Sequence, residues 1–268
     1  LLTQKGYHSL WVWPILLIAI FFIVNFIITN RQATHPIVHF HTLFSKKPFV
    51  GATMAISSHL TLLTGIAGIN VYIVRILKLP FDISLHFYFF FFVGVIITGI
   101  LKMFFYSSVG AGFLGTLGSS ALLYVSIHWI ILGNTINIPL LYIQGLLLGF
   151  GASMTLVSGS MATLLDGDLK EAAQRSQTMH TIRNFSAAML IPIIAYTIKN
   201  HIQKGTQSIY AENITDKMIY LKKLQDVAID ADHQIFLLMI IFNMVMFVSS
   251  IIQMILGKGR RITPPRES

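Results

Sequence analysis

Few residues of this 268-residue sequence could carry chemistry, and three neighbouring histidines are the first to consider. His35, His39 and His41 lie close together in the chain, as metal ligands often do. However, Pro36 interrupts any regular helix between them, and no carboxylate lies near to complete a ligand set. We therefore expect no metal site here.

The sequence also lacks the short motifs that mark nucleotide-binding and hydrolytic enzymes. It has no Walker loop, no dinucleotide fingerprint, no zinc-protease helix and no nucleophile elbow. Cysteine is absent, so disulfides and thiolate chemistry are excluded. We expect a protein that is not an enzyme and that binds no cofactor.

Other polar residues are embedded in long apolar runs, where ionisable side chains are functional by default. His59 follows two serines near the centre of one run, and it either faces a cavity or is a hydrogen-bonded core imidazole. Gln144, Gly151, Met154 and Ser158 share one face of a later run, because they are three, four or seven residues apart. This stripe is the pore-lining surface that periodicity predicts, although hydrogen bonds between helices explain most buried polar residues equally well.

Glycines recur in the same apolar runs at helical spacing. Gly145 and Gly149 form a pair of the kind that lets two membrane helices approach closely. Helix packing is the simpler interpretation, and a substrate-lining or hinge role is the alternative.

The composition shows what kind of protein must position these residues. The chain is 54% hydrophobic and 11% charged, whereas a soluble domain carries about 25% charged residues. A water-soluble enzyme and a folded nucleic-acid binder are close to excluded, and so is a disordered chain. The net charge of +9 is spread over the connections between apolar runs and forms no stripe for nucleic acid. The expected surrounding is the lipid bilayer.

The apolar runs predict an all-α membrane protein with seven transmembrane helices. A bilayer core of about 30 Å takes roughly 20 residues of helix. The runs are continuously apolar and lack the alternation of barrel strands. The predicted spans are residues 10–29, 50–74, 84–106, 110–132, 138–163, 179–198 and 235–256.

The connections predict how these spans lie in the membrane. Two connections are long, residues 30–49 and 199–234, and the second is expected to be a polar loop that becomes an amphipathic helix before the last span. Lys and Arg are more frequent in the alternate connections that share a side with the C-terminus, which predicts a cytoplasmic C-terminus. No Asp or Glu lies in the middle of a predicted span, so the spans are almost without carboxylates. The chain begins at Leu1 without a leader, and we expect a segment of a longer product.

The order of these parts is similar to that of a known transporter family. The first span ends at Asn30-Arg31, and His35-Pro36-Ile37-Val38, Leu43-Phe44 and a basic pair precede the next span. This resembles the middle of fourteen-helix major facilitator transporters of the EmrB/QacA drug:proton antiporter type. Residues 148–152 resemble the Gly-rich tenth core helix of that family, and residues 172–185 resemble the cytoplasmic segment that leads into its next helix. The chain departs from the family at Ser186-Ala187, where the family has Gly-Gly.

The resemblance implies a division of the chain. Residues 1–48 would be a linker transmembrane helix with its cytoplasmic connector, residues 49–257 a six-helix C-terminal bundle, and residues 258–268 a basic cytoplasmic tail. An N-terminal half would be the partner, and it would hold the proton-coupling carboxylates of the family. The second, third, fifth and sixth runs would border a central cavity. The substrate-pathway candidates are then His59, Asn70, Gln144, Met154, Ser158 and Asn184, and the cytoplasmic gate or loop candidates are Lys102, Arg175 and Arg183.

The leading hypothesis is that the chain is the C-terminal half of a secondary transporter in the bacterial inner membrane. It would export small organic compounds in exchange for protons. A seven-helix receptor or sensor is an alternative, although no lysine lies in the middle of the last span to hold a retinal. An inactive, truncated transporter remnant is a further alternative.

Overall fold

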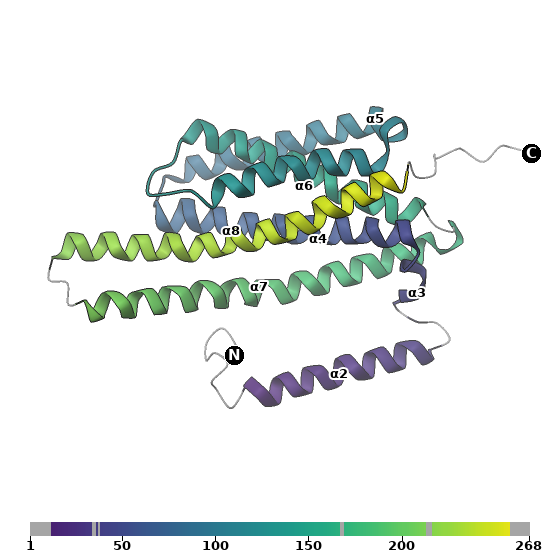
Figure 1. The fold of residues 1–268 in the computed structure, drawn as a ribbon, viewed down its shortest axis with the longest axis horizontal. Helices are drawn as coiled ribbons and strands as arrows, with labels where there is room; N and C mark the ends of the chain where they lie inside the picture. The colour runs from purple at the N-terminus through teal and green to yellow at the C-terminus, as the bar shows by residue number, and fades with distance from the viewer. Residues whose placement is uncertain (1–11, 34–35, 37, 167–168, 213–215, 258–268) are drawn as a thin grey trace, which may run out of the picture.

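The computed structural model describes residues 12–33, 36, 38–166, 169–212 and 216–257, and every long element in it is a helix (Figure 1). The predicted basic tail, His35 and Ile37 lie outside the described residues. The elements in chain order are α2 (Val12–Gln32), α3 (Phe40–Leu43), α4 (Lys46–Asn70) continued by the π-helix η1 (Val71–Ile76), α5 (Phe81–Trp129), α6 (Ile138–Leu165), the 3-10 helix η2 (Leu169–Glu171), α7 (Ala172–Ala211) and α8 (Lys217–Ile255).

Five of these helices are long and apolar enough to cross a membrane, and they indicate an integral multi-pass membrane protein. They are α4 with η1, α5, α6, α7 and α8. The prediction of seven spans is therefore wrong. The apolar part of α2 that the structure describes, Leu16–Gln32, is shorter than a full span, and the runs 84–106 and 110–132 are two helices that meet at Gly110 within the one long element α5.

The two runs meet at one glycine, where α5 reverses direction. Gly110 has φ 82° and ψ 171°, a backbone conformation that residues with a Cβ rarely adopt. Before this turn, Phe91 lies against Gly149 and the Thr98 hydroxyl donates to the Phe150 carbonyl, so α5 runs parallel to α6. After the turn the order along α6 is reversed, because Trp129 is hydrogen-bonded to Gln144. The two halves of α5 are thus antiparallel.

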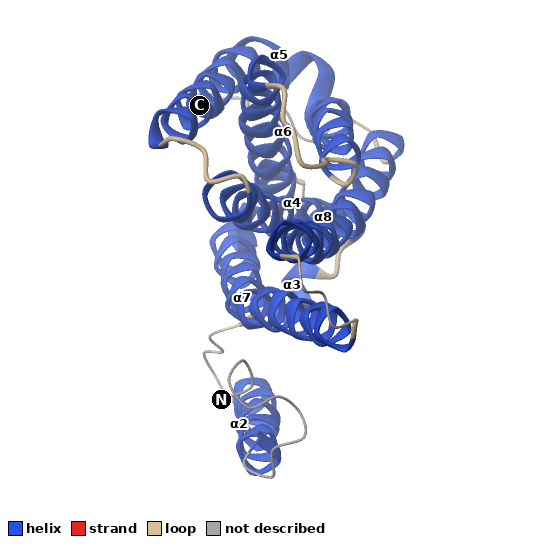
Figure 2. Ribbon diagram, turned by 90° about the vertical axis from the view of Figure 1, so that its left-hand side faces the viewer, coloured by secondary structure: helices blue, strands red, loops and turns tan. Residues whose placement is uncertain are grey.

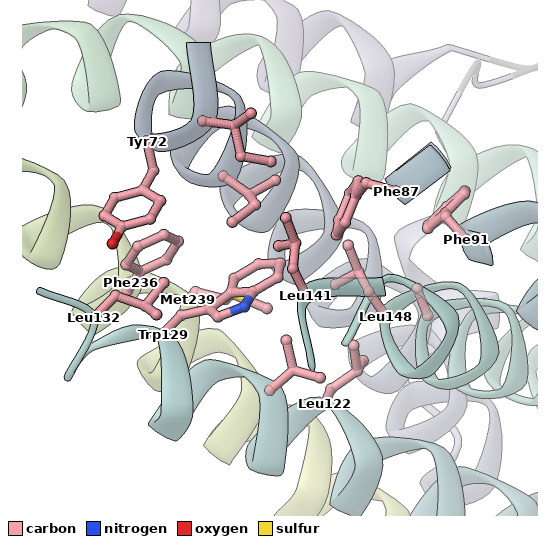
Figure 3. Packing of buried hydrophobic residues seen from close by; sticks show 14 of the residues in the cluster. Tyr72, Phe87, Phe91, Leu122, Trp129, Leu132, Leu141, Leu148, Phe236 and Met239 are labelled. Atoms are coloured by element: carbon pink, nitrogen blue, oxygen red, sulfur yellow. The ribbon is translucent and has the colours of Figure 1, made fainter. Parts of the chain in front are cut away.

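The core of the bundle lies between α4, α5, α6 and α8. Seen along the helices, α4 and α8 occupy the middle, α5 and α6 lie on one side, α7 lies on the other side, and α2 stands apart (Figure 2). Aromatic side chains fill the centre: Tyr72, Phe87, Trp129 and Phe236 are fully buried (Figure 3). The exposed outer faces are also apolar, which indicates contact with the lipid bilayer.

Helices α5 and α6 touch backbone to backbone through glycines. A Cβ added to Gly149 would lie 1.9 Å from the carbonyl oxygen of Phe91, and one added to Gly94 would lie 2.1 Å from that of Leu146. Gly145 approaches the Phe87 carbonyl in the same way. The close packing predicted for the Gly145–Gly149 pair is confirmed.

The long polar loop predicted for residues 199–234 is wrong in its first part. Helix α7 continues to Ala211 because this region packs on α8, where the Val227 side chain lies against Gly205. Asp216 then caps α8 by accepting hydrogen bonds from the backbone N–H groups of Met218 and Ile219. The helix predicted before the last span is present, as the first part of α8.

Candidate functional site

The inner face of α8 carries polar side chains along most of the bundle. Asp232, Asn243, Ser250 and Gln253 are separated by eleven, seven and three residues, which places them on one side of the helix. All four are buried. Apolar neighbours such as Phe236, Met239 and Met246 separate them on the same face.

Three of these four residues have partners outside α8, and Ser250 donates from its hydroxyl to the Met54 sulfur of α4 at 3.0 Å. Asn243 donates from Nδ2 to the Ser126 hydroxyl of α5 at 3.4 Å. Gln253 donates from Nε2 to the Asp166 carboxylate at the end of α6, at 2.9 Å. The remaining oxygens, Oδ1 of Asn243 and Oε1 of Gln253, have no hydrogen-bond partner among the described residues. These amides are therefore only half satisfied.

Asp232 is the exception on this face, because its carboxylate has no partner. The residue is 1% exposed, and neither oxygen is hydrogen-bonded within the described part of the chain. The side chain interacts electrostatically with Tyr72, whose hydroxyl donates to the Gly133 carbonyl instead. The next residue, His233, is hydrogen-bonded through Nε2 to the Leu132 carbonyl at 2.8 Å.

Sequence reasoning missed Asp232 because it lies before the apolar run 235–256, in a stretch with several charges. The spacing of Asp232 from its apolar neighbours is a signal that could have predicted its burial. Asp232 is three residues after Ile229 and four before Phe236, and both belong to the buried core. A helical pattern extended backwards from the apolar run would have placed the carboxylate on the inner face.

The predicted stripe on α6 is buried inside the bundle. Gln144 is 1% exposed and accepts a hydrogen bond at 2.8 Å from the indole N–H of Trp129, while its Nε2 has no partner among the described residues. Met154 is fully buried against Gly118 of α5. The buried hydroxyl of Ser158 also lacks a partner in the described part of the chain.

Two predicted pathway residues face side chains of neighbouring helices. His59 of α4 is half-buried and lies near Arg183 of α7, a cation that is not an ion-pair partner for it. The Nε of Arg183 is buried and has no hydrogen-bond partner among the described residues. Asn70, at the end of α4, accepts a hydrogen bond at 2.8 Å from the Tyr88 hydroxyl of α5. Asn184 is exposed on α7 and is not brought near the other candidates by any contact recorded for the described residues.

The two other basic candidates bind carbonyl groups. Lys102 is buried and donates from Nζ to the Ser153 carbonyl of α6 at 2.7 Å. Arg175 is 1% exposed and donates to the carbonyls of Thr163 and Leu164, at 3.0 and 2.9 Å. Its guanidinium also lies 3.7 Å from the Glu171 carboxylate. Arg175 thus covers the C-terminal end of α6, where a cation is favoured.

A cavity opens where the inner face of α8 reaches the turn of α5. It has a volume of about 450 Å³ and is lined by Ser108, Gly110, Phe113 and Gln253, among others. A smaller cavity of about 180 Å³ lies between α7 and α8 and is mostly apolar. Gln253, which is 1% exposed, therefore forms part of the wall of this cavity.

Comparison with known proteins gives no family for this chain. No family model matches it, and no curated protein matches it.

Proposed function

We propose that this chain is the C-terminal half of a secondary transporter that exports small organic compounds in exchange for protons. The support is a multi-pass apolar bundle with polar groups inside it, together with the order of segments described above. The partner in this proposal is an N-terminal half of similar design, which would cover the half-buried face around His59 and Arg183.

The observation that carries the proposal is the set of incompletely bonded polar atoms in the interior. Each buried donor or acceptor without a partner costs about 1–3 kcal/mol. Five residues of α6 and α8 keep such an atom when the described part of the chain is considered: Asp232, Asn243, Gln253, Gln144 and Ser158. A purely structural bundle would be more stable with apolar residues at these positions. A transporter, in contrast, needs such groups to bind polar parts of a substrate or an ion once the helices move apart.

Flux measurements with the purified full chain test this proposal. The chain is reconstituted into liposomes, alone and together with the product of the coding sequence upstream of it, and efflux of a fluorescent organic cation is followed after a pH gradient is imposed. We expect flux that depends on the gradient and on the N-terminal half. Flux that ignores both would contradict the proposal, and a gene with no further spans upstream would favour the receptor or the remnant.

A matched pair of variants on α6 links the flux to the interior. Gln144→Leu removes a buried amide, whereas Ile143→Leu changes the neighbouring side chain, which is 55% exposed. We expect Gln144→Leu to lower the flux and Ile143→Leu to leave it unchanged. Equal flux in both variants would show that the α6 stripe is not part of the pathway.

A further inference from the structure

We propose that the Asp232 carboxyl group is a proton-binding site of this protein, occupied as the neutral acid inside the bundle and emptied when α8 moves. The inference rests on the proposed function and deepens it, because it assigns the coupling ion to a residue of this half. The sequence alone would leave that role to the half that precedes it.

The first argument is the environment of the carboxyl group. Asp232 faces the core between Ile229 and Phe236, one helical turn away on either side. An ionised carboxylate buried without a counter-charge is far more costly than a neutral polar group. Asp232 has no ion pair and no hydrogen bond within the described part of the chain. The state that fits this site is the protonated one.

The second argument is that the neighbouring groups are already engaged elsewhere. From α4 and η1, Tyr72 is the titratable group that faces Asp232, and its hydroxyl donates to Gly133. The ring of His233 is held by Leu132. These bonds engage the Tyr72 hydroxyl and one ring nitrogen of His233, so a proton from water is the partner left for Asp232.

Other titratable groups near this level of the bundle lie away from the inner face of α8. His128 of α5 packs on the Tyr124 ring, with ring centroids 6.2 Å apart. His201 and Lys204 of α7 line a cavity of about 270 Å³ with Asp230. None of these groups forms a hydrogen bond or an ion pair with Asp232 within the described residues.

The third argument is access to water. Asp230 is exposed on α8 only two residues before Asp232, and Asp226, one turn further, is hydrogen-bonded to Asn134 of the connection after α5. The exposed Asp230 marks the outer side of α8, so the water-accessible surface lies within one helical turn of the buried carboxyl group. Water needs to reach only a short distance along α8 to exchange a proton with the site.

The proton cycle changes one bond. A proton taken from water forms the O–H bond of the neutral carboxylic acid at Asp232. When α8 moves and water enters, this O–H bond breaks, the proton returns to water, and a carboxylate remains. The burial of that carboxylate is unfavourable until it binds the next proton, which couples proton loss to the open state.

Infrared difference spectroscopy on the full chain in lipid vesicles tests the site without a substrate. We expect a carboxylic-acid C=O band at neutral pH that disappears at alkaline pH. This band should be absent from Asp232→Asn, which has the shape of the neutral acid, and present in the control Asp230→Asn. A wild-type spectrum without the band, or the same band in Asp232→Asn, would overturn the proposal. Circular dichroism confirms that both variants are folded.

The flux assay separates this proposal from the proposed function. If the chain transports, we expect Asp232→Asn to lose the dependence of flux on the pH gradient and Asp230→Asn to keep it. Unchanged dependence in Asp232→Asn would overturn the proton site while transport stands. A titrating Asp232 band in a chain that moves no compound, with or without its N-terminal half, would retain the proton site and overturn the proposed function.

Discussion

Two charged residues that are almost fully buried lie toward opposite ends of the bundle, and their surroundings differ. At the end where α6 finishes, Arg175 is 1% exposed and is bonded to two carbonyls and a carboxylate. At the other end, Asp232 is equally buried and has no partner among the described residues. Removing a buried charge that is paired and hydrogen-bonded destabilises a fold, whereas a buried charge without partners has a stability cost that a function can explain. Arg175 is therefore a structural residue and Asp232 a functional candidate, although both are buried in the same bundle.

Replacing Arg175 by methionine should have the largest effect. The variant removes two charge-assisted hydrogen bonds at the end of α6, each contributing about 1.5 kcal/mol, so we expect a loss of roughly 3 kcal/mol in the free energy of unfolding. Denaturation in detergent micelles followed by circular dichroism measures this. Arg175→Lys keeps the charge but not the planar fork of donors, and it should fall between wild type and Arg175→Met. A stable Arg175→Met variant would remove the contrast between the two ends.

Trp129→Phe tests the Trp129–Gln144 pair, in which the buried amide is hydrogen-bonded through its oxygen but not, within the described residues, through its nitrogen. Gln144 has one partner, the indole N–H, and this variant would leave both ends of its amide unpaired. We expect a loss of about 2 kcal/mol in the free energy of unfolding. The control is Trp13→Phe, because Trp13 is 54% exposed and should be replaceable at almost no cost. Equal effects at the two positions would show that the Gln144 hydrogen bond does not contribute.

Asp232→Leu should shift stability in the opposite direction to Arg175→Met. Leucine has a similar volume and removes a polar group that lacks partners, so we expect the free energy of unfolding at neutral pH to rise by about 1 kcal/mol. The same denaturation experiment measures it. A clear loss of stability would mean that Asp232 has a structural partner, and the two ends of the bundle would then be alike.

The smallest effect is expected for Asp230→Asn. Asp230 is exposed and two residues from Asp232, and surface substitutions of this kind change stability by less than about 0.5 kcal/mol. Thermal unfolding compared with wild type checks this. A larger change would show that charge at this end of α8 matters irrespective of burial.

Sequence reasoning recovered the helical, membrane-embedded class and the helix boundaries of α4 and α6 closely, because continuous apolar runs depend only on composition and length. It failed where tertiary contacts decide how far a helix extends. The helical part of residues 199–211 depends on contacts such as that between Gly205 and Val227, which no local pattern reveals.

The same distinction applies to the candidate site. The α6 stripe through Gln144 and Ser158 was recognisable, because its residues lie within one uniform apolar run. Asp232 was not, because its burial comes from η1, through Tyr72, and from the connection after α5. Periodicity locates a face of a helix, and only the packing of other helices decides whether that face is excluded from water.

The turn at Gly110 also bears on how the protein is made. Because the reversal takes a single residue, no hydrophilic loop with its own charges separates the two halves of α5. The usual topology signal of basic loop residues has little room at this point. We expect the two halves to enter the bilayer together as a preformed hairpin. A side chain at position 110 would then cause a defect in biogenesis, visible as a chain that is degraded after synthesis.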